Sequence, residues 1–194
     1  MDIKKYFQKS AEVISVLHKN EEKIKKICDD ILKINKSNKK ILVAGNGGSC
    51  SDAEHFSGEL QCTYKDRDRK PISAISLGSH PAAITAWSND FGYNTYFKRQ
   101  VEAHGNAGDI LFLISTGGGN EKNGASMNLV EAAKVAKIRK MKIISLLGKS
   151  GGLLKTMSDT YILVENDVTS HIQEAHISIL HCICEILDEK KDSL

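Results

Sequence analysis

The chain has 194 residues, of which 41% are hydrophobic, and a formal net charge of +3 at pH 7. This length suits one domain with a substantial core, and the scattered charge offers no basic patch for nucleic acid. No apolar run approaches the ~18 residues of a membrane span, and residues 1–5 lead into no apolar signal segment. The five cysteines have no metal-finger spacing. We therefore expect a cytoplasmic protein with reduced thiols, without a nucleic-acid partner or a membrane anchor.

Residues 1–38 are predicted to form an N-terminal helical segment. Apolar residues recur at three- and four-residue spacing between positions 5 and 34, which favours two helices, and the polar residues 35–38 form a linker. We expect the apolar stripe of these helices to exceed what a short sheet can cover and to mark a contact between subunits. Its members are Ile14, Leu17, Ile24, Ile27 and Ile31.

Between residues 39 and 194, apolar strands alternate with helical segments. The strands are expected at 41–44, 72–77, 110–114, 142–147 and 160–164. The helices are expected just after residue 48 and at 82–87, 94–103, 129–140 and 170–189. This alternation with short connections predicts an α/β three-layer sandwich, in which helices flank a parallel sheet. With the N-terminal helices, the whole chain is expected to form one compact domain.

Glycine-containing loops follow three of the predicted strands, at residues 45–48, 117–119 and 148–152. Parallel strands end at the same edge of a sheet, and ligands bind outside that edge. Glycines that lead into a helix let backbone N–H groups approach an anion, and the helix dipole adds to the attraction. The sequence therefore predicts a binding site for a phosphate or a polar sugar at this edge.

The helix after the first glycine loop carries His55 and Glu59 four residues apart, with Asp52 one turn earlier on the same side. Such a pair is common on the surface of any helix, so the spacing alone leaves that interpretation open. The position of the pair next to the glycine loop favours a catalytic role over a surface contact. A carboxylate and an imidazole suit the proton transfers of a sugar isomerase near neutral pH.

Several motifs together resemble the phosphoheptose isomerase branch of the sugar isomerase (SIS) domain family, over residues 40 to 189. They are Gly45-Asn46-Gly47-Gly48-Ser49, His55 with Glu59, Ser88-Asn89-Asp90-Phe91-Gly92, Ile114-Ser115-Thr116, and Ile172-Gln173-Glu174 with His176 and His181. The resemblance implies the SIS fold. It also implies an aldose–ketose isomerase that converts sedoheptulose 7-phosphate to D-glycero-D-manno-heptose 7-phosphate through an enediol, for lipopolysaccharide or capsule heptose.

The resemblance also implies site residues. Glu59 would be the catalytic base and His181 the acid. The substrate-binding residues would be Asn46, Gly47, Gly48, Ser49, Glu59, Asn89, Asp90, Ser115, Thr116, Gly117, Ser126 and Gln173. The family's loop pattern Ser-Thr-Ser-Gly-Asn-Ser is altered here, because Gly117 replaces a serine and about six extra residues precede Ser126.

A divalent metal, usually zinc, is implied at His55, Glu59, Gln173 and His181, and no organic cofactor is implied. On one straight helix, Gln173 and His181 would lie ~12 Å apart along the axis. Either Gln173 lies at an uncoiled helix start, or different subunits contribute to the site. The family is tetrameric, so we expect a homotetramer with shared sites. His176 faces about 140° away from His181 around the helix and is therefore not included in the predicted site.

Two alternatives remain open. One is a non-catalytic SIS adaptor that binds a sugar phosphate or regulates replication, but such adaptors tend to lose the residues that match Glu59 and His181. The other is an isomerase of another sugar phosphate. Thr63 and the segment Ser170-His171 stand where arginine is common in the family, and this favours keeping that alternative.

Overall fold

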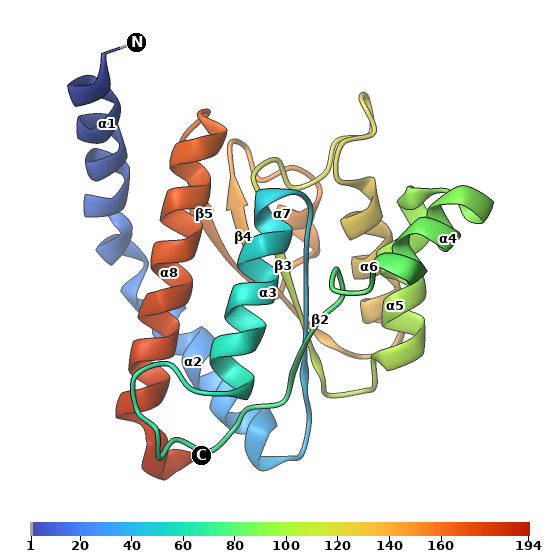
Figure 1. Ribbon diagram of the computed structural model, residues 1–194, viewed down its shortest axis with the longest axis horizontal. Coiled ribbons are helices and arrows are strands. Elements are labelled where there is room, and N and C mark those ends of the chain that lie inside the picture. Colours follow the sequence, from blue (N-terminus) through green and yellow to red (C-terminus); the bar gives the residue numbers. More distant parts are fainter. Residues whose placement is uncertain (1) are drawn as a thin grey trace.

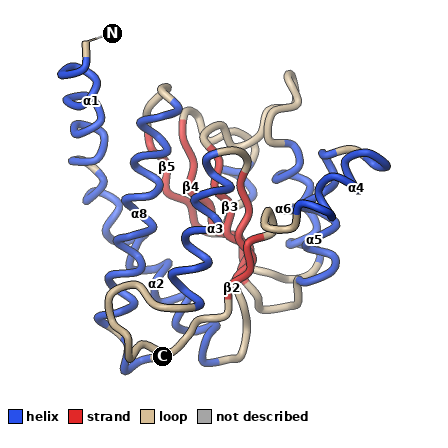
Figure 2. Tube along the Cα trace, in the orientation of Figure 1, coloured by secondary structure: helices blue, strands red, loops and turns tan. Residues whose placement is uncertain are grey.

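The computed structural model describes residues 2–194 and shows a parallel five-stranded sheet between two layers of helices (Figures 1 and 2). The strand order is β2-β1-β3-β4-β5, and every neighbouring pair is parallel. The strands are β1 (Ile41–Gly45), β2 (Ala74–Ser76), β3 (Ile110–Ser115), β4 (Lys142–Gly148) and β5 (Thr160–Val164). The predicted α/β three-layer sandwich with a parallel sheet is therefore confirmed.

One face of the sheet is covered by α2 (Glu21–Lys36), α3 (Gly48–Gln61) and α8 (Thr169–Glu189), and the helix α1 (Ile3–Ser15) extends beside α8 (Figure 1). The other face is covered by α5 (Tyr96–His104), α6 (Met127–Ile138) and α7 (Leu154–Met157), with α4 (Pro81–Phe91) outside them. Short 3-10 turns complete the chain: η1 (Leu17–Asn20), η2 (Tyr93–Thr95) and η3 (Lys191–Ser193).

The sheet is apolar on both faces, because alternate residues of each strand point to opposite layers. In β1, Ile41 and Val43 pack toward α2, α3 and α8, whereas Leu42 and Ala44 pack toward α5 and α6. Two cores therefore hold the strand ends at fixed positions. The loops at the carboxyl edge are carried by a rigid support.

The expected subunit-contact stripe is wrong for the second helix. Ile24, Ile27 and Ile31 are at most 6% exposed, because α2 packs against α8 and the sheet within the same chain. The apolar exposure lies on α1 and just after it instead. The residues concerned are Ile3, Phe7, Ile14 and Val16.

Some element boundaries also differ from the prediction. The strand expected at 72–77 is only three residues long, and the helix expected at 82–87 extends to Phe91. The helix α7 was not predicted. It has only four residues, too few for a periodic apolar pattern to be visible.

The described helices include none that is long and apolar enough to cross a membrane. The five cysteines are free thiols. Burial raises the pKa of Cys28 and of Cys184 to about 12. Cys184 is buried, whereas Cys182 is exposed.

Candidate active site

The predicted glycine turn connects β1 to α3 at the carboxyl edge of the sheet. Gly47 has a φ of 57°, which a residue with a side chain rarely adopts. The N–H of Ser49 donates to the carbonyl of Asn46 (3.1 Å), and that of Cys50 donates to the carbonyl of Gly47 (2.9 Å). The chain therefore reverses within a few residues, and the first turn of α3 lies at the mouth of the sheet.

His55, Glu59 and His181 come together beside this turn. The Nε2 atoms of His55 and His181 lie 3.0 Å apart, although the two residues are 126 positions apart in the sequence. His55 Nε2 also lies 3.4 Å from Glu59 Oε1, within one turn of α3. The structure thus joins the two predicted catalytic side chains through a shared histidine.

The cluster can carry protons. At 3.0 Å, one of the two imidazoles donates an Nε2–H and the other accepts it through a lone pair. Glu59 is 23% exposed, so its carboxylate is reachable from solvent without being fully hydrated. One turn earlier, burial raises the pKa of Asp52 to about 6, and His55 opposes the shift.

Gln173 does not join this cluster within one chain. It lies in the second turn of α8, so the alternative of an uncoiled helix start is excluded. Its amide packs against Gly48, where an added Cβ would come within 2.5 Å of Nε2. Eight helical residues, or about 12 Å, separate Gln173 from His181. Gln173 therefore belongs to the glycine turn, at some distance from the imidazole pair.

The loop after β3 is shaped by its own backbone. The N–H of Gly118 donates to Ser115 Oγ (2.9 Å), and that hydroxyl donates to Ser126 Oγ (3.3 Å). Gly118 and Gly119 pack against the backbone of the β4–α7 loop, where Leu154 N–H donates to the Gly118 carbonyl (2.8 Å). Ser115 and Ser126 are thus brought together as predicted, while the Ser115 hydroxyl is already engaged inside the loop.

A cavity of about 310 Å³ opens over this loop. Its lining residues are Gly117, Gly119, Asn120, Glu121, Lys122, Ser150, Gly152 and Leu153. Backbone amides of glycine-rich loops are the usual donors to phosphate where no arginine is present. The cavity is therefore a suitable place for a phosphate group.

Asn46 is held by two residues that the sequence did not identify. It exchanges two hydrogen bonds with Asn128, at 3.0 and 2.9 Å, and its Oδ1 accepts a third from the hydroxyl of Tyr93 (2.8 Å). Asn128 follows Ser126 in the segment matched to the phosphate loop, which was the one available signal. The network fixes the amide of Asn46 at the edge of the site.

Asn89 and Asp90 lie on α4, outside the α5–α6 layer. Both are exposed, and Asn89 Nδ2 donates to Asp90 Oδ1 (2.8 Å). They lie in the last turn of the helix. Their contact with a sugar stays a prediction. Thr63 donates its hydroxyl to the Asp66 carbonyl (2.8 Å).

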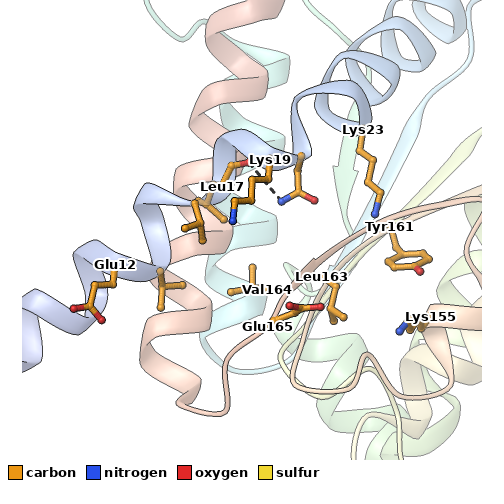
Figure 3. Close-up of a pocket in the computed structure, with 12 residues that line it drawn as sticks. Glu12, Leu17, Lys19, Lys23, Lys155, Tyr161, Leu163, Val164 and Glu165 are labelled. Carbon is orange, nitrogen blue, oxygen red and sulfur yellow. Dashed lines mark hydrogen bonds between the residues drawn. The ribbon is translucent and has the colours of Figure 1, made fainter.

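A larger cavity of about 530 Å³ lies elsewhere, between the α1–α2 connection and β5 (Figure 3). It is lined by residues such as Lys23, Lys155 and Tyr161, and it includes none of the predicted site residues. Lys23 Nζ lies 4.7 Å from the centre of the Tyr161 ring. This cavity is separate from the imidazole–carboxylate cluster.

Among residues 2–194, His, Cys, Asp and Glu side chains form no group of three or more at the spacing of metal ligands. The predicted ligands divide into two sets. His55, Glu59 and His181 form one cluster, and Gln173 lies at the glycine turn. Within one chain, the four predicted zinc ligands therefore do not meet at one point.

Comparison with known proteins decides the family. A family model described as "SIS domain" matches residues 5–148. The chain belongs to the SIS domain family. Phosphoheptose isomerase 1 of Campylobacter jejuni is 38% identical, and the match covers 96% of this chain and 97% of that one. A phosphoheptose isomerase of Helicobacter pylori is 47% identical over 77% of this chain and 74% of its own.

Solved structures place the chain in the same branch of the SIS family. The phosphoheptose isomerase of Neisseria gonorrhoeae superposes with a TM-score of 0.87 at 34% identity, covering 96% of this chain and 97% of that one. The one from Francisella tularensis gives the same TM-score at 35% identity and covers 96% of both chains. The predicted membership of the phosphoheptose isomerase branch is confirmed.

Proposed function

We propose that this SIS-family chain is an isomerase that interconverts sedoheptulose 7-phosphate and D-glycero-D-manno-heptose 7-phosphate. The support is twofold. Two relatives, 38% and 47% identical to this chain over the matched residues, are named phosphoheptose isomerases. The observation that carries the proposal is the meeting of Glu59 and His181 through His55 at the carboxyl edge of the sheet. The product would supply heptose for lipopolysaccharide or capsule.

The chemistry follows from the residues of the cluster. Glu59 removes the proton from the hydroxyl-bearing carbon next to the ketone, and the electron pair of that C–H bond forms an enediol. The carboxylic acid so formed returns the proton to the neighbouring carbon, which completes the shift of the carbonyl. His181 moves a proton between the two oxygens, for which an imidazole that both donates and accepts is suited.

The phosphate end of the sugar is assigned to the loop after β3. The cavity of about 310 Å³ is lined by Gly117 and Gly119, whose backbone amides are candidate donors, and Thr116 and Ser126 belong to the same loop. Neutral donors suffice for a phosphate when they converge from a fixed loop. Gly48 and Asn46, with Gln173 beside them, would bind the sugar between the phosphate and the reacting carbons.

The cluster also fits a divalent metal by its donor chemistry. Two imidazoles and a carboxylate are the donor types of a catalytic zinc set, although these three side chains do not stand at the spacing of metal ligands in the described chain. We assign His55, Glu59 and His181 as ligands, with Gln173 of the partner subunit as the fourth. A bound zinc ion would polarise a substrate oxygen as a Lewis acid. Full activity after exhaustive EDTA treatment, with no zinc by elemental analysis, contradicts this assignment.

A homotetramer with sites between neighbouring copies is part of the proposal. The helix α1 presents Ile3 and Phe7 at 66% exposure each, and Ile14 lies further along it. An apolar helix face of this kind usually marks a subunit contact. Sedimentation of a fully active monomer would contradict the assembly. The free thiols support the cytoplasm as the compartment.

The experiment uses the purified protein with sedoheptulose 7-phosphate, and NMR follows the appearance of aldose. Glu59→Gln should lower kcat by ~10²–10⁴-fold, because it removes the base and changes little volume. The matched control is Glu54→Gln, an exposed carboxylate on the same helix, which should keep the parent rate. The base is assigned wrongly if Glu59→Gln keeps more than about a tenth of the rate. Absence of aldose with the parent protein refutes the substrate.

A further inference from the structure

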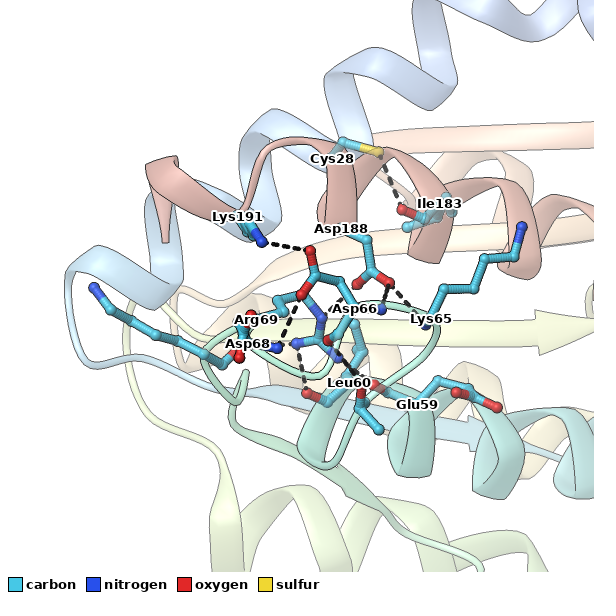
Figure 4. A network of polar contacts seen from close by, with 12 residues as sticks. Cys28, Glu59, Leu60, Lys65, Asp66, Asp68, Arg69, Ile183, Asp188 and Lys191 are labelled. Carbon is cyan, nitrogen blue, oxygen red and sulfur yellow. Dashed lines mark hydrogen bonds and ion pairs between the residues drawn. The ribbon is translucent and has the colours of Figure 1, made fainter.

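The loop between α3 and β2, residues 62–73, is fastened to the end of α8 by one buried ion pair (Figure 4). Arg69 is 4% exposed and Asp188 is 8% exposed. The guanidinium Nε–H of Arg69 donates to Asp188 Oδ1 at 2.7 Å. Two buried charges in direct contact, with four of the five guanidinium N–H groups directed at acceptors, form a rigid and directional joint.

The guanidinium of Arg69 also binds the C-terminal end of α3. It donates to the backbone carbonyls of Glu59 and Leu60, and to that of Lys70 at 2.9 Å. The last carbonyls of a helix have no partners within the helix, so a cation there satisfies them and complements the helix dipole. Arg69 therefore binds the same turn of α3 that carries the Glu59 side chain.

The carboxylate of Asp188 holds the loop from the other side. Its Oδ2 accepts the backbone N–H groups of Lys65 and Asp66, each at 2.8 Å. These two residues directly follow Tyr64. Asp188 thereby fixes the backbone at the point where the Tyr64 side chain leaves it.

Tyr64 lies over His181. The two rings are stacked, with centroids 5.8 Å apart and an angle of 28° between their planes. His55 approaches the same imidazole nearly edge-on, at 5.1 Å and 65°. The His181 ring therefore has two aromatic neighbours in contact with it. Rotation of its plane would break the 3.0 Å contact between the two Nε2 atoms.

We infer that Tyr64, Arg69 and Asp188 are positioning residues of the acid–base cluster, which rests on the isomerase function proposed above. The ion pair sets the distance between α3, which carries Glu59, and α8, which carries His181. Tyr64 sets the plane of the His181 ring. A displacement of about 1 Å in such a cluster lowers the rate by ~10²-fold, so fixing two separate helices is a requirement of the chemistry.

The first experiment compares Tyr64→Phe with Tyr64→Leu. The phenylalanine keeps a ring to stack on His181, whereas the leucine keeps apolar volume without a ring. We expect kcat of Tyr64→Phe within about 2-fold of the parent, and kcat of Tyr64→Leu lower by about 10-fold with KM changed less than about 3-fold. Tyr161→Leu, a half-buried tyrosine on β5, is the matched control and should leave kcat unchanged.

The second experiment replaces the ion pair by apolar residues of similar size, Arg69→Met with Asp188→Leu. Both partners are replaced together, because removal of one would leave the other charge buried and unpaired. The backbone N–H groups of Lys65 and Asp66 lose their acceptor in this variant, so its melting temperature is measured first. A double variant with the parent melting temperature and oligomeric state should still lose about 10-fold or more in kcat at nearly constant KM. The control is Asp29→Asn, which removes the carboxylate of an exposed ion pair between Asp29 and Lys190.

Two kinetic results overturn the inference: Tyr64→Leu with the parent kcat, or a Tyr64→Phe variant as slow as Tyr64→Leu, which would give the hydroxyl a chemical role. If the double variant fails to fold, the tyrosine series still decides. A signature independent of activity separates this inference from the proposed function. The imidazole 15N signals of His55 and His181 should shift in Tyr64→Leu and not in Tyr161→Leu, whether or not the parent turns over sedoheptulose 7-phosphate. Unchanged signals refute the inference.

Discussion

The buried side chain of His176 makes the free energy of unfolding of the protein depend on pH. The ring is fully buried on the face of α8 that meets the sheet, and its Nε2–H donates to the carbonyl of Leu147 (3.1 Å). Its Nδ1 is buried without a hydrogen-bond partner among the described residues. Burial lowers the pKa of His176 from 6.5 to about 4, and the bond to Leu147 opposes the shift.

The sign of the effect follows from proton binding. Between pH 6.5 and about 4, the unfolded chain takes up a proton on this histidine and the folded chain does not. The contribution of neutral His176 to the free energy of unfolding is therefore complete above pH 6.5, and it is lost as the pH falls to about 4. A pKa difference of this size corresponds to about 3 kcal/mol of unfolding free energy.

The assay is urea unfolding of the parent and of His176→Gln from pH 7.5 to 4.5, at one fixed protein concentration. The His176→Gln variant is less stable at pH 7.5, because it loses the packing of the ring and the hydrogen bond from Nε2–H to Leu147. Its side-chain amide takes up no proton between pH 7.5 and 4.5. The stability gap should therefore narrow by about 2–3 kcal/mol toward pH 4.5. His80→Gln, which changes an exposed histidine, should keep the parent's pH dependence. Parallel curves for the parent and His176→Gln would refute the reasoning.

Two further predictions concern the site. Gly48→Ala should reduce kcat/KM by about 10-fold, because a Cβ would displace the amide of Gln173, whereas Gly58→Ala, with open space around it on the same helix, should keep the parent value. Equal activity of the two variants contradicts a role for Gln173. Mixing inactive Glu59→Gln with inactive His181→Asn subunits should restore part of the activity if neighbouring copies share sites, and no recovery after verified subunit exchange argues against sharing.

The sequence was sufficient for the parts of the site that depend on local periodicity. A β-former run, a glycine turn and a four-residue spacing placed His55 and Glu59 on one face at the sheet edge, and the 3.4 Å contact agrees. The angular argument that removed His176 from the site also holds, since its ring faces Leu147. In each case one helix or one strand–helix junction determines the geometry.

No local pattern in the sequence predicts the contacts between segments that are far apart in the chain. Arg69 and Asp188 are 119 positions apart, and each is unremarkable in a charged stretch of sequence. Tyr64 meets His181 only because that pair fixes the loop. Nothing local distinguishes such residues from the solvated charges beside them, so a single sequence without the fold cannot select them.

The phosphate loop allows one last prediction, because its three glycines are not equivalent. Gly118 has a φ of 68°, and a side chain there would collide with the carbonyl of Gly151, so glycine is required. Gly117 has open space around it and no positive φ. Gly117→Ser should therefore fold normally and add a hydroxyl donor to the cavity. We expect KM for sedoheptulose 7-phosphate to fall by about 3- to 10-fold, the value of one added hydrogen bond. Gly118→Ser, the matched control, should lower the melting temperature. An unchanged KM in a folded Gly117→Ser enzyme would place the phosphate away from this loop.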